Sequence, residues 1–420
     1  MVDVAGLARL FTAPGLYGEF APSPYWTGVE LVWPAPAPRA ADAPLADVFA
    51  AAVAELCGDA ETVGVKLSGG LDSLAVLVHV AALRPARRVI AYCTDLIDDT
   101  GASAAVAARR LVAELDLAAE LVVVDPAACA AAPAWSAYGP RPDALPAVNA
   151  TVAELAADAG VQMLLSGDGA DELLAVPRYA TGAIARASGV RAAWRYAADV
   201  RRSGPGLPGE VLALVADRLP ARARARWYWA ANWPAWCRPT VSSVVAEPQR
   251  EPALAWAGDW VAATVAGHAA ARRNWVQADA FDSFWPRTYT PPAGDVPEAS
   301  PFLHTKVVAT ALALPAAARY DASLPTAYQR CKAAVVRLLA EPTRSVLPTN
   351  KAYYTRALAR AVAGPIEVPV ATEAGLLDPE VLAGEAETAV RMTAMAVEAW
   401  LAGAVAHGFA VPGVSSGSAA

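Results

Sequence analysis

Two short segments, far apart in the chain, have the residue types that bind phosphates and metal ions. The first reads SGGLDS over residues 68–73, and the second reads SGDGADE over residues 166–172. Glycines let the backbone approach an anion closely, and hydroxyls and unpaired backbone N–H groups donate hydrogen bonds to it. Carboxylates repel a phosphate unless a cation such as Mg²⁺ lies between them. Together these residues predict a site for a nucleotide and a metal ion.

The first segment predicts a phosphate-binding loop between a strand and a helix. It follows the β-forming run TVGVKL at 62–67 and opens a helical stretch. It is neither a GxxxxGK[ST] loop nor a GxGxxG loop. Because the loop carries no lysine, we expect pyrophosphate to leave, and not the terminal phosphoryl group to be transferred. The alternative is a tight turn without a ligand, and Asp72 argues against it.

The second segment holds three carboxylates within seven residues, directly after the apolar run VQMLL at 161–165. Such crowding of like charges costs electrostatic energy unless a cation or a substrate neutralises it. The segment therefore predicts the metal-binding side of the same site.

The pattern between these segments predicts an α/β fold, a doubly wound parallel sheet with right-handed crossovers. The strands are expected at 62–67, 88–94, 120–125 and 161–165, and the helices at about 72–83, 102–118 and 149–159. With strand order 3-2-1-4, the first and fourth strands are neighbours at the switch point. Asp72 and Asp171 should then face one another across one crevice.

The remaining sequence divides the chain into four parts. Residues 1–45, rich in proline and aromatics, predict an extended arm and linker, and 46–200 form the predicted nucleotide-binding core. Residues 201–365 predict a mainly helical lobe, and 366–420 predict a helix within 377–409 and a disordered tail.

Composition excludes several classes of protein. The net charge of −7 and the short basic clusters argue against nucleic acid as a partner. Five scattered cysteines and four dispersed histidines give neither a disulfide framework nor a zinc site. We expect a cytoplasmic protein without a membrane span, because no signal peptide or sufficiently long apolar run is present.

The pair of segments resembles the synthetase domain of asparagine synthetases and β-lactam synthetases, an ATP-pyrophosphatase domain of the adenine nucleotide alpha hydrolase type. Further similarity lies in SPFLHTKVV at 300–308, QRCKAAVVRLLA at 329–340 and SVLPTNKAYYTRAL at 345–358. The resemblance implies ATP and Mg²⁺ as cofactors. It also implies residues that hold pyrophosphate (Ser68, Gly69, Gly70, Asp72, Ser73), ligands of Mg²⁺ (Asp72, Asp171) and contacts to the nucleotide (Ser166, Gly167).

Two further roles follow from the resemblance. Lys351, within the LP…K element, would stabilise charge on the adenylate and the tetrahedral intermediate, with Lys332 as the fallback and a surface lysine as the alternative. Asp168 stands where these families carry glutamate or tyrosine and would deprotonate the attacking amine, although its side chain is shorter.

The chain departs from the family pattern at two places. His304 replaces the aspartate of a PFLD segment, and Val2 stands where glutamine-dependent members have a cysteine nucleophile. We therefore expect no glutaminase domain, so the amine is free ammonia, ammonia from a partner, or an amine on the substrate itself.

The C-terminal half is similar to actinobacterial lasso-peptide cyclases, notably at NWPAWCRPTV (232–241) and over 374–403. This favours a macrolactam-forming peptide cyclase, with a leader-peptide-binding protein or protease as a candidate partner. Alternatives are ammonia-dependent amidation of a small acid and a non-catalytic homologue; the clustered carboxylates argue against the last. The tryptophans and arginines at 222–236 either line a peptide cleft or form core and solvated faces.

Overall fold

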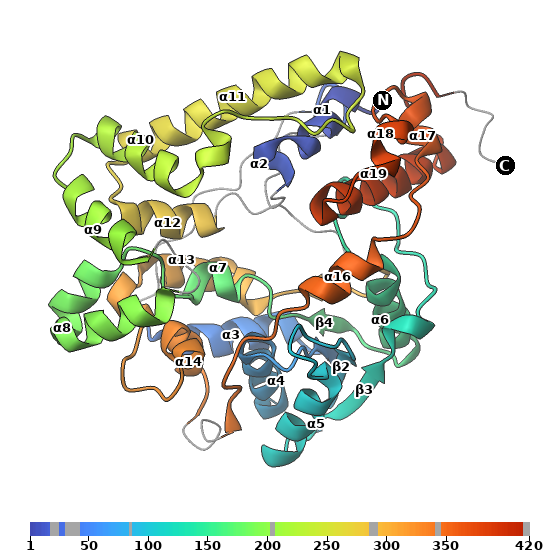
Figure 1. Cartoon of the computed structure of the whole chain (residues 1–420). Helices are drawn as coiled ribbons and strands as arrows, with labels where there is room; N and C mark the ends of the chain where they lie inside the picture. Colours follow the sequence, from blue (N-terminus) through green and yellow to red (C-terminus); the bar gives the residue numbers. More distant parts are fainter. Residues whose placement is uncertain are drawn as a thin grey trace.

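A parallel sheet with helices on both sides forms one half of the molecule, the lower half in Figure 1. The computed structural model describes residues 1–16, 25–29, 43–83, 86–201, 206–284, 293–340 and 346–414. Within these residues the sheet has five strands in the order β3-β2-β1-β4-β5. The strands are β1 (Thr62–Lys66), β2 (Arg88–Thr94), β3 (Glu120–Val124), β4 (Met163–Leu165) and β5 (Glu298–Ala299). Every pairing is parallel.

Alternation along β2 shows why helices cover both faces of the sheet. Val89, Ala91 and Cys93 belong to the larger core, which also includes side chains of α3 (Leu45–Cys57), α4 (Leu71–Leu83) and α5 (Ala104–Glu114). Ile90 and Tyr92 point to the other face and pack with α6 (Pro146–Asp158). Successive strand residues face opposite sides, so a strand buried on both faces must be apolar throughout. The predicted doubly wound α/β fold and the strand order 3-2-1-4 are confirmed.

The fifth strand was not predicted. β5 has two residues and pairs with β4 through Leu164↔Glu298 and Leu165↔Ala299. So short a segment carries no alternation that could mark it in the sequence.

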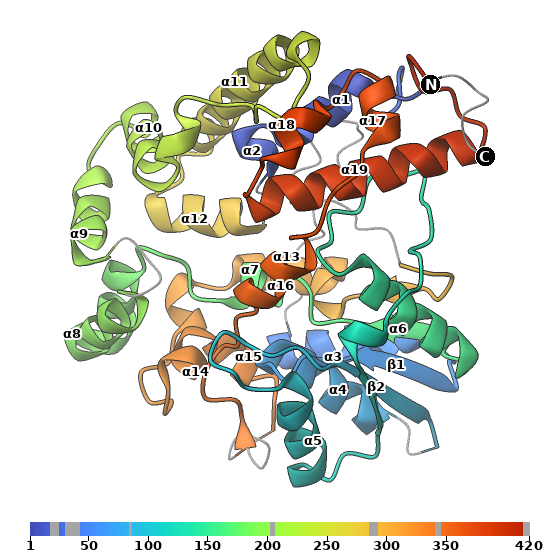
Figure 2. The same ribbon diagram turned by 45° about the vertical axis from the view of Figure 1, so that its right-hand side comes forward.

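Helices dominate the chain after β4, as the sequence predicts. They are α7 (Ala170–Leu174), α8 (Thr181–Val200), α9 (Gly206–Ala216), α10 (Ala221–Asn232), α11 (Glu247–Ala270), α12 (Trp275–Phe284), α13 (Thr305–Ala313), α14 (Ala327–Cys331), α15 (Ala333–Val336) and α16 (Thr355–Ala361). α16 lies between the sheet-bearing half of the molecule and the layer formed by α10, α11, α12 and α19 (Thr388–Ala406), as Figure 2 shows.

The predicted extended arm is wrong for the first 16 residues. They form α1 (Val4–Ala8), a 3₁₀ turn over Arg9–Phe11 and α2 (Ala13–Leu16). Asp3 caps α1 by accepting a hydrogen bond from the Gly6 N–H at 3.0 Å. These residues share a core with α17 (Pro369–Glu373), α18 (Pro379–Ala383) and α19. The predicted linker falls largely on 30–42 and the predicted disordered tail on 415–420, which lie outside the described residues.

The length and composition of α19 bear on whether the chain could span a membrane. Of the described helices, it alone is long and apolar enough to cross a bilayer. Val390, Val397, Trp400 and Leu401 of α19 are buried against the N-terminal helices and α17, which is the environment of a core helix.

Candidate active site

The two glycine-rich segments meet at the carboxyl ends of adjacent strands. β1 and β4 are paired in register through Val65↔Leu165, so the loops that follow them begin side by side. A Cβ atom on Gly167 would lie 2.8 Å from the Ser73 backbone nitrogen and 3.0 Å from the Asp72 carbonyl carbon. Glycine at 167 is therefore what allows the second loop to approach the first.

The first loop is a compact turn whose hydroxyls bond one another. Gly69 has φ +77°, in the left-handed region that glycine adopts readily. The Ser68 N–H donates to Ser73 Oγ at 3.1 Å, and the two Oγ atoms lie 3.1 Å apart. The Leu71 N–H donates to the Tyr328 hydroxyl at 3.4 Å. Burial of this hydroxyl raises the pKa of Tyr328 to about 12. The loop thus reaches α4 with serine oxygens at its mouth.

Two lysines hold the two metal-ligand candidates together. Lys332 Nζ contacts Asp72 Oδ2 and lies 2.6 Å from Asp171 Oδ1, while Lys351 Nζ lies 3.0 Å from Asp171 Oδ2. Asp72 and Asp171 therefore do face one crevice. The lysines differ in burial, because the Lys332 side chain is 4% exposed and that of Lys351 is 43% exposed.

The charges in this cluster shift one another's pKa values. Burial raises the pKa of Asp72, and the charge of Lys332 opposes that shift without cancelling it. Burial also acts to raise the pKa of Asp171, but Lys332 and Lys351 outweigh it and hold the pKa below its ordinary value. Burial alone would lower the pKa of Lys332, yet the two carboxylates raise it. Lys332 is therefore a stably charged ammonium between two aspartates.

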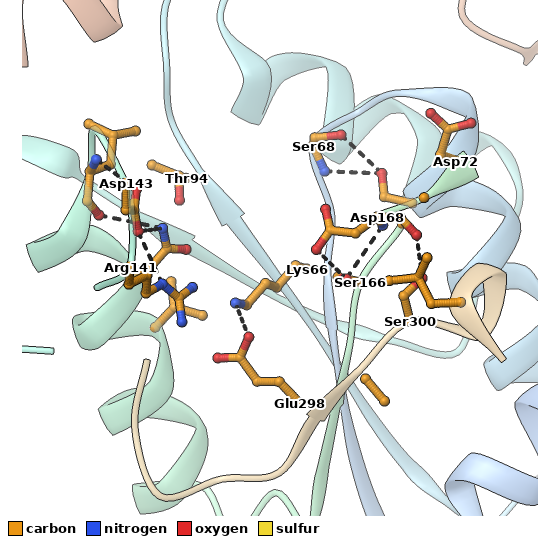
Figure 3. Close-up of a pocket in the computed structure, with 18 of the residues that line it drawn as sticks. Lys66, Ser68, Asp72, Thr94, Arg141, Asp143, Ser166, Asp168, Glu298 and Ser300 are labelled. Atoms are coloured by element: carbon orange, nitrogen blue, oxygen red, sulfur yellow. Dashed lines mark hydrogen bonds and ion pairs between the residues drawn. The ribbon is translucent and has the colours of Figure 1, made fainter. Parts of the chain in front are cut away.

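Asp72 and Asp171 of this cluster line a cavity of about 1110 Å³. Figure 3 shows Ser68, Asp72 and Asp168 on one side of this cavity and Arg141 and Asp143 on the other. Asp171 lines the cavity as well, and so do Tyr138 and Asn149, which flank Arg141 and Asp143 in the sequence. This volume is slightly above the range of about 300–1,000 Å³ that is typical of small-molecule sites, and it gives room for a nucleotide and a second substrate together.

The sequence matches the asparagine synthase family over residues 44–362, more than half of the chain. The chain belongs to this family. Asparagine synthases are ATP-dependent ligases that form amides, which accounts for a phosphate-binding loop at one end of a cavity with room for two substrates. No curated protein matches the chain.

The donor set of this asparagine synthase site fits a magnesium ion. Asp72 Oδ1 is buried and has no hydrogen-bond partner among the described residues. A buried acceptor oxygen of this kind is suited to coordinate a metal ion. Two carboxylates that share a site with substrate phosphates are the usual protein ligands of Mg²⁺. No cluster of three or more acidic, histidine or cysteine side chains occurs in the described parts of the chain. Substrate phosphates and water would therefore complete the coordination.

Asp168 lies at the mouth of the second loop and is exposed. Its Oδ2 accepts a hydrogen bond from Ser166 Oγ at 2.8 Å, and its carbonyl oxygen accepts one from Ser300 Oγ at 2.6 Å. Both contacts fix the loop, and the carboxylate still lines the cavity. Asp168 therefore presents an exposed carboxylate to the cavity.

Several residues of the cavity were not expected from the sequence. Lys66, at the end of β1, pairs with Glu298 of β5 at 2.7 Å, and Arg141 pairs with Asp143 at 3.5 Å. A lysine inside the apolar run TVGVKL is a signal that could have marked Lys66. Arg141 belongs to a loop without a recognisable pattern, and no such signal exists for it.

The tryptophans at 227–236 do not line this cavity. Trp229 and Trp236 are buried in a separate core with Trp275, which favours the core interpretation over the peptide cleft. His304 does line the cavity, and its Nε2 lies 3.4 Å from Glu55 Oε1. His304 thus replaces the aspartate of PFLD, and the carboxylate beside it comes from Glu55 of α3.

Proposed function

We propose that the protein is an AMP-forming amide ligase that joins the N-terminal amine of a peptide substrate to the side-chain carboxylate of an Asp or Glu residue, forming a macrolactam. The observation that carries the first part is the convergence of two glycine-rich loops at one end of a cavity large enough for two substrates, with Asp72 and Asp171 of these loops paired to Lys332 and Lys351. We further propose that it acts in the cytoplasm, on a peptide supplied by a leader-peptide-binding protein or protease, without nucleic acid or membrane.

The reaction has two steps. A carboxylate oxygen of the substrate bonds to the α-phosphorus of ATP, and the bond to pyrophosphate breaks. The amine nitrogen then bonds to the acyl carbon, AMP leaves with the oxygen, and Asp168 accepts a proton from the amine. Lys351 and Lys332 offset the charge that grows on the phosphates and the tetrahedral intermediate.

Ser68, Gly69, Gly70 and Ser73 would hold the pyrophosphate, and Ser166 and Gly167 would contact the nucleotide. When bound by Asp72 and Asp171, Mg²⁺ supplies positive charge that makes pyrophosphate a better leaving group. Lys332, which lies between these carboxylates, keeps them from repelling one another before ATP binds.

A peptide substrate is supported by the far end of the cavity, because residues from outside the family match contribute to it. Leu10 and Tyr25 of the N-terminal segment line the cavity with Tyr138. A substrate as small as aspartate would not need a wall at that distance from the phosphate loop. The alternative is ammonia-dependent amidation of a small carboxylic acid, which the phosphate end alone would support.

The test incubates the protein with Mg²⁺ and ATP in two reactions, one with aspartate and ammonium and one with a linear peptide that has an N-terminal glycine and an internal glutamate. We expect AMP only with the peptide, and a product lighter by one water. Asp72→Ala and Asp171→Ala are the controls and should release no AMP. AMP with aspartate and ammonium would replace the cyclase by the alternative, and ADP in either reaction would refute both.

A further inference from the structure

Lys66 occupies a position that structural stability does not explain. It ends the central strand β1, and its side chain lines the cavity while it pairs with Glu298 Oε2 at 2.7 Å. The side chains of Lys66 and Glu298 are only 23% and 18% exposed. Removing such a pair from water costs about as much as the pairing returns, so a link between β1 and β5 is a weak reason for it.

The pair lies between the two ends of the cavity. Lys66 precedes Ser68 of the phosphate loop by two positions, and Figure 3 shows the Lys66–Glu298 pair between that loop and Arg141 with Asp143. The lysines at the phosphate end, Lys332 and Lys351, are engaged with Asp72 and Asp171. Lys66 contacts neither of these aspartates in any described interaction.

The proposed adenylation brings two negatively charged groups together. A carboxylate must approach a triphosphate, and both carry negative charge, so a cation beside the α-phosphate that is not bound to the phosphates lowers the cost of the approach. The ammonium of Lys66 has three donors, of which one serves Glu298. Glu298 is itself held by the Ala293 N–H, which donates to Oε1 at 3.3 Å.

We propose that Lys66 binds the substrate carboxylate that becomes adenylated, with Glu298 as its positioning residue. The remainder of the acyl substrate then extends toward Tyr25, Tyr138 and Asn149, away from the phosphate loop. This inference rests on the proposed AMP-forming ligase and names the place of its acyl substrate.

The experiment compares Lys66→Gln, Lys66→Arg and Glu298→Gln in the full chain, with AMP release measured against ATP and against the glutamate peptide. Lys66→Gln should raise the KM for the peptide about tenfold or more, as expected for the loss of a charged hydrogen bond, and change the KM for ATP by less than about twofold. Lys66→Arg should restore most of the peptide affinity. Glu298→Gln should have a smaller effect, because the ammonium remains.

A neutral competitor separates binding of the carboxylate from binding of the peptide body. The same peptide with glutamine in place of the reacting glutamate should inhibit the wild-type protein and Lys66→Gln with equal Ki. Lys306→Gln is the matched control, because Lys306 also pairs with a glutamate, Glu55 at 2.9 Å, but on the surface. It should leave all constants unchanged.

Three outcomes would overturn the inference. Equal losses of thermal stability in Lys66→Gln and Glu298→Gln, with the peptide KM unchanged, would make the pair a structural link. An equal rise of both KM values would make Lys66 a phosphate ligand. Failure of the wild-type protein to release AMP with any substrate would refute the proposed function itself, and would be seen before any variant is made.

Discussion

The two ends of the cavity are built in different ways. The phosphate end consists of two short loops between a strand and a helix, so close that Gly167 has no room for a Cβ beside Ser73. The far end is formed by the long connection between β3 and α6, whose backbone accepts hydrogen bonds from side chains far away in the sequence. Trp26 Nε1 donates to the Ala137 carbonyl at 2.7 Å, and Trp400 Nε1 donates to the Ser136 carbonyl at 2.8 Å.

This difference determines which end of the cavity can be recognised as a sequence motif. Loops fixed by backbone contacts keep their geometry wherever the strand order is kept, and the family match from 44 to 362 includes them. Trp26 and Trp400, which fix the far wall, lie outside that match. We therefore expect substitutions at the phosphate end to impair the chemistry, and substitutions at the far end to impair recognition of the acyl substrate.

The largest effect should come from Lys332→Met. It leaves Asp72 and Asp171 adjacent without their shared cation, so the free energy of unfolding should fall by about 3 kcal/mol. AMP release should fall by about a hundredfold or more. Lys351→Met removes a partly exposed partner of Asp171, and should cost similar activity with a change of less than about 1 kcal/mol in unfolding.

Urea unfolding and AMP release of both variants check this contrast. Equal destabilisation by the two substitutions would show that burial of Lys332 does not distinguish it from Lys351.

Gly167→Ala should have the next largest effect. The new methyl group would meet the Ser73 backbone nitrogen at 2.8 Å and push the two loops apart, which should cost about 1–3 kcal/mol of stability and raise the KM for ATP. Gly267→Ala in α11 is the control, since nothing lies within 4 Å of its Cβ position. It should be neutral or stabilising by roughly 0.5–1 kcal/mol. Thermal unfolding of the two variants measures this difference. If Gly167→Ala unfolded at the same temperature as the wild-type protein, the two loops would not be in close contact.

Trp400→Phe tests the far end. It keeps the aromatic packing with Trp26 and Trp135 but removes the donor to Ser136, worth about 1 kcal/mol. The KM for the peptide should rise by less than about fivefold while the KM for ATP stays constant. Steady-state kinetics with each substrate varied in turn measures both. Trp227→Phe, at a side chain 46% exposed outside the cavity, should change neither. A larger effect on ATP than on peptide would contradict the division of the cavity.

The smallest effect should be a change in pH dependence at Glu398. Its carboxylate accepts the N–H groups of Val370 and Ala371 at 3.0 and 2.8 Å, while burial raises its pKa and these bonds only partly offset the rise. A folded pKa above the unfolded one gives a contribution to stability that is full below the unfolded pKa, about 4.3, and is lost as the pH rises through the folded pKa. Glu398→Gln should flatten this slope in thermal unfolding as the pH rises above about 4.3. An unchanged slope would assign it to other groups.

The sequence predicted strands β1 to β4 and the meeting of the two glycine-rich loops, because both depend on local patterns. Short runs rich in valine, isoleucine or leucine, each followed by a polar residue, predicted β1 to β4 within a few residues, and the meeting of the motifs after β1 and β4 followed from the strand order. It could not rank Lys332 above Lys351, because only the packing of α14 and α15 decides which ammonium is buried between the aspartates. It also missed the helices of residues 4–16, whose stability comes from burial against α19.

The bond between Trp400 and Ser136 has a consequence for the order in which the protein acquires its parts during translation. The two residues are 264 positions apart, so at about 5–20 residues per second Ser136 waits on the order of 10–50 s for its partner. Lys351 emerges before Trp400 does, which completes the phosphate end first. The residues of the phosphate end are therefore all synthesised before the bond that fixes the far wall can form.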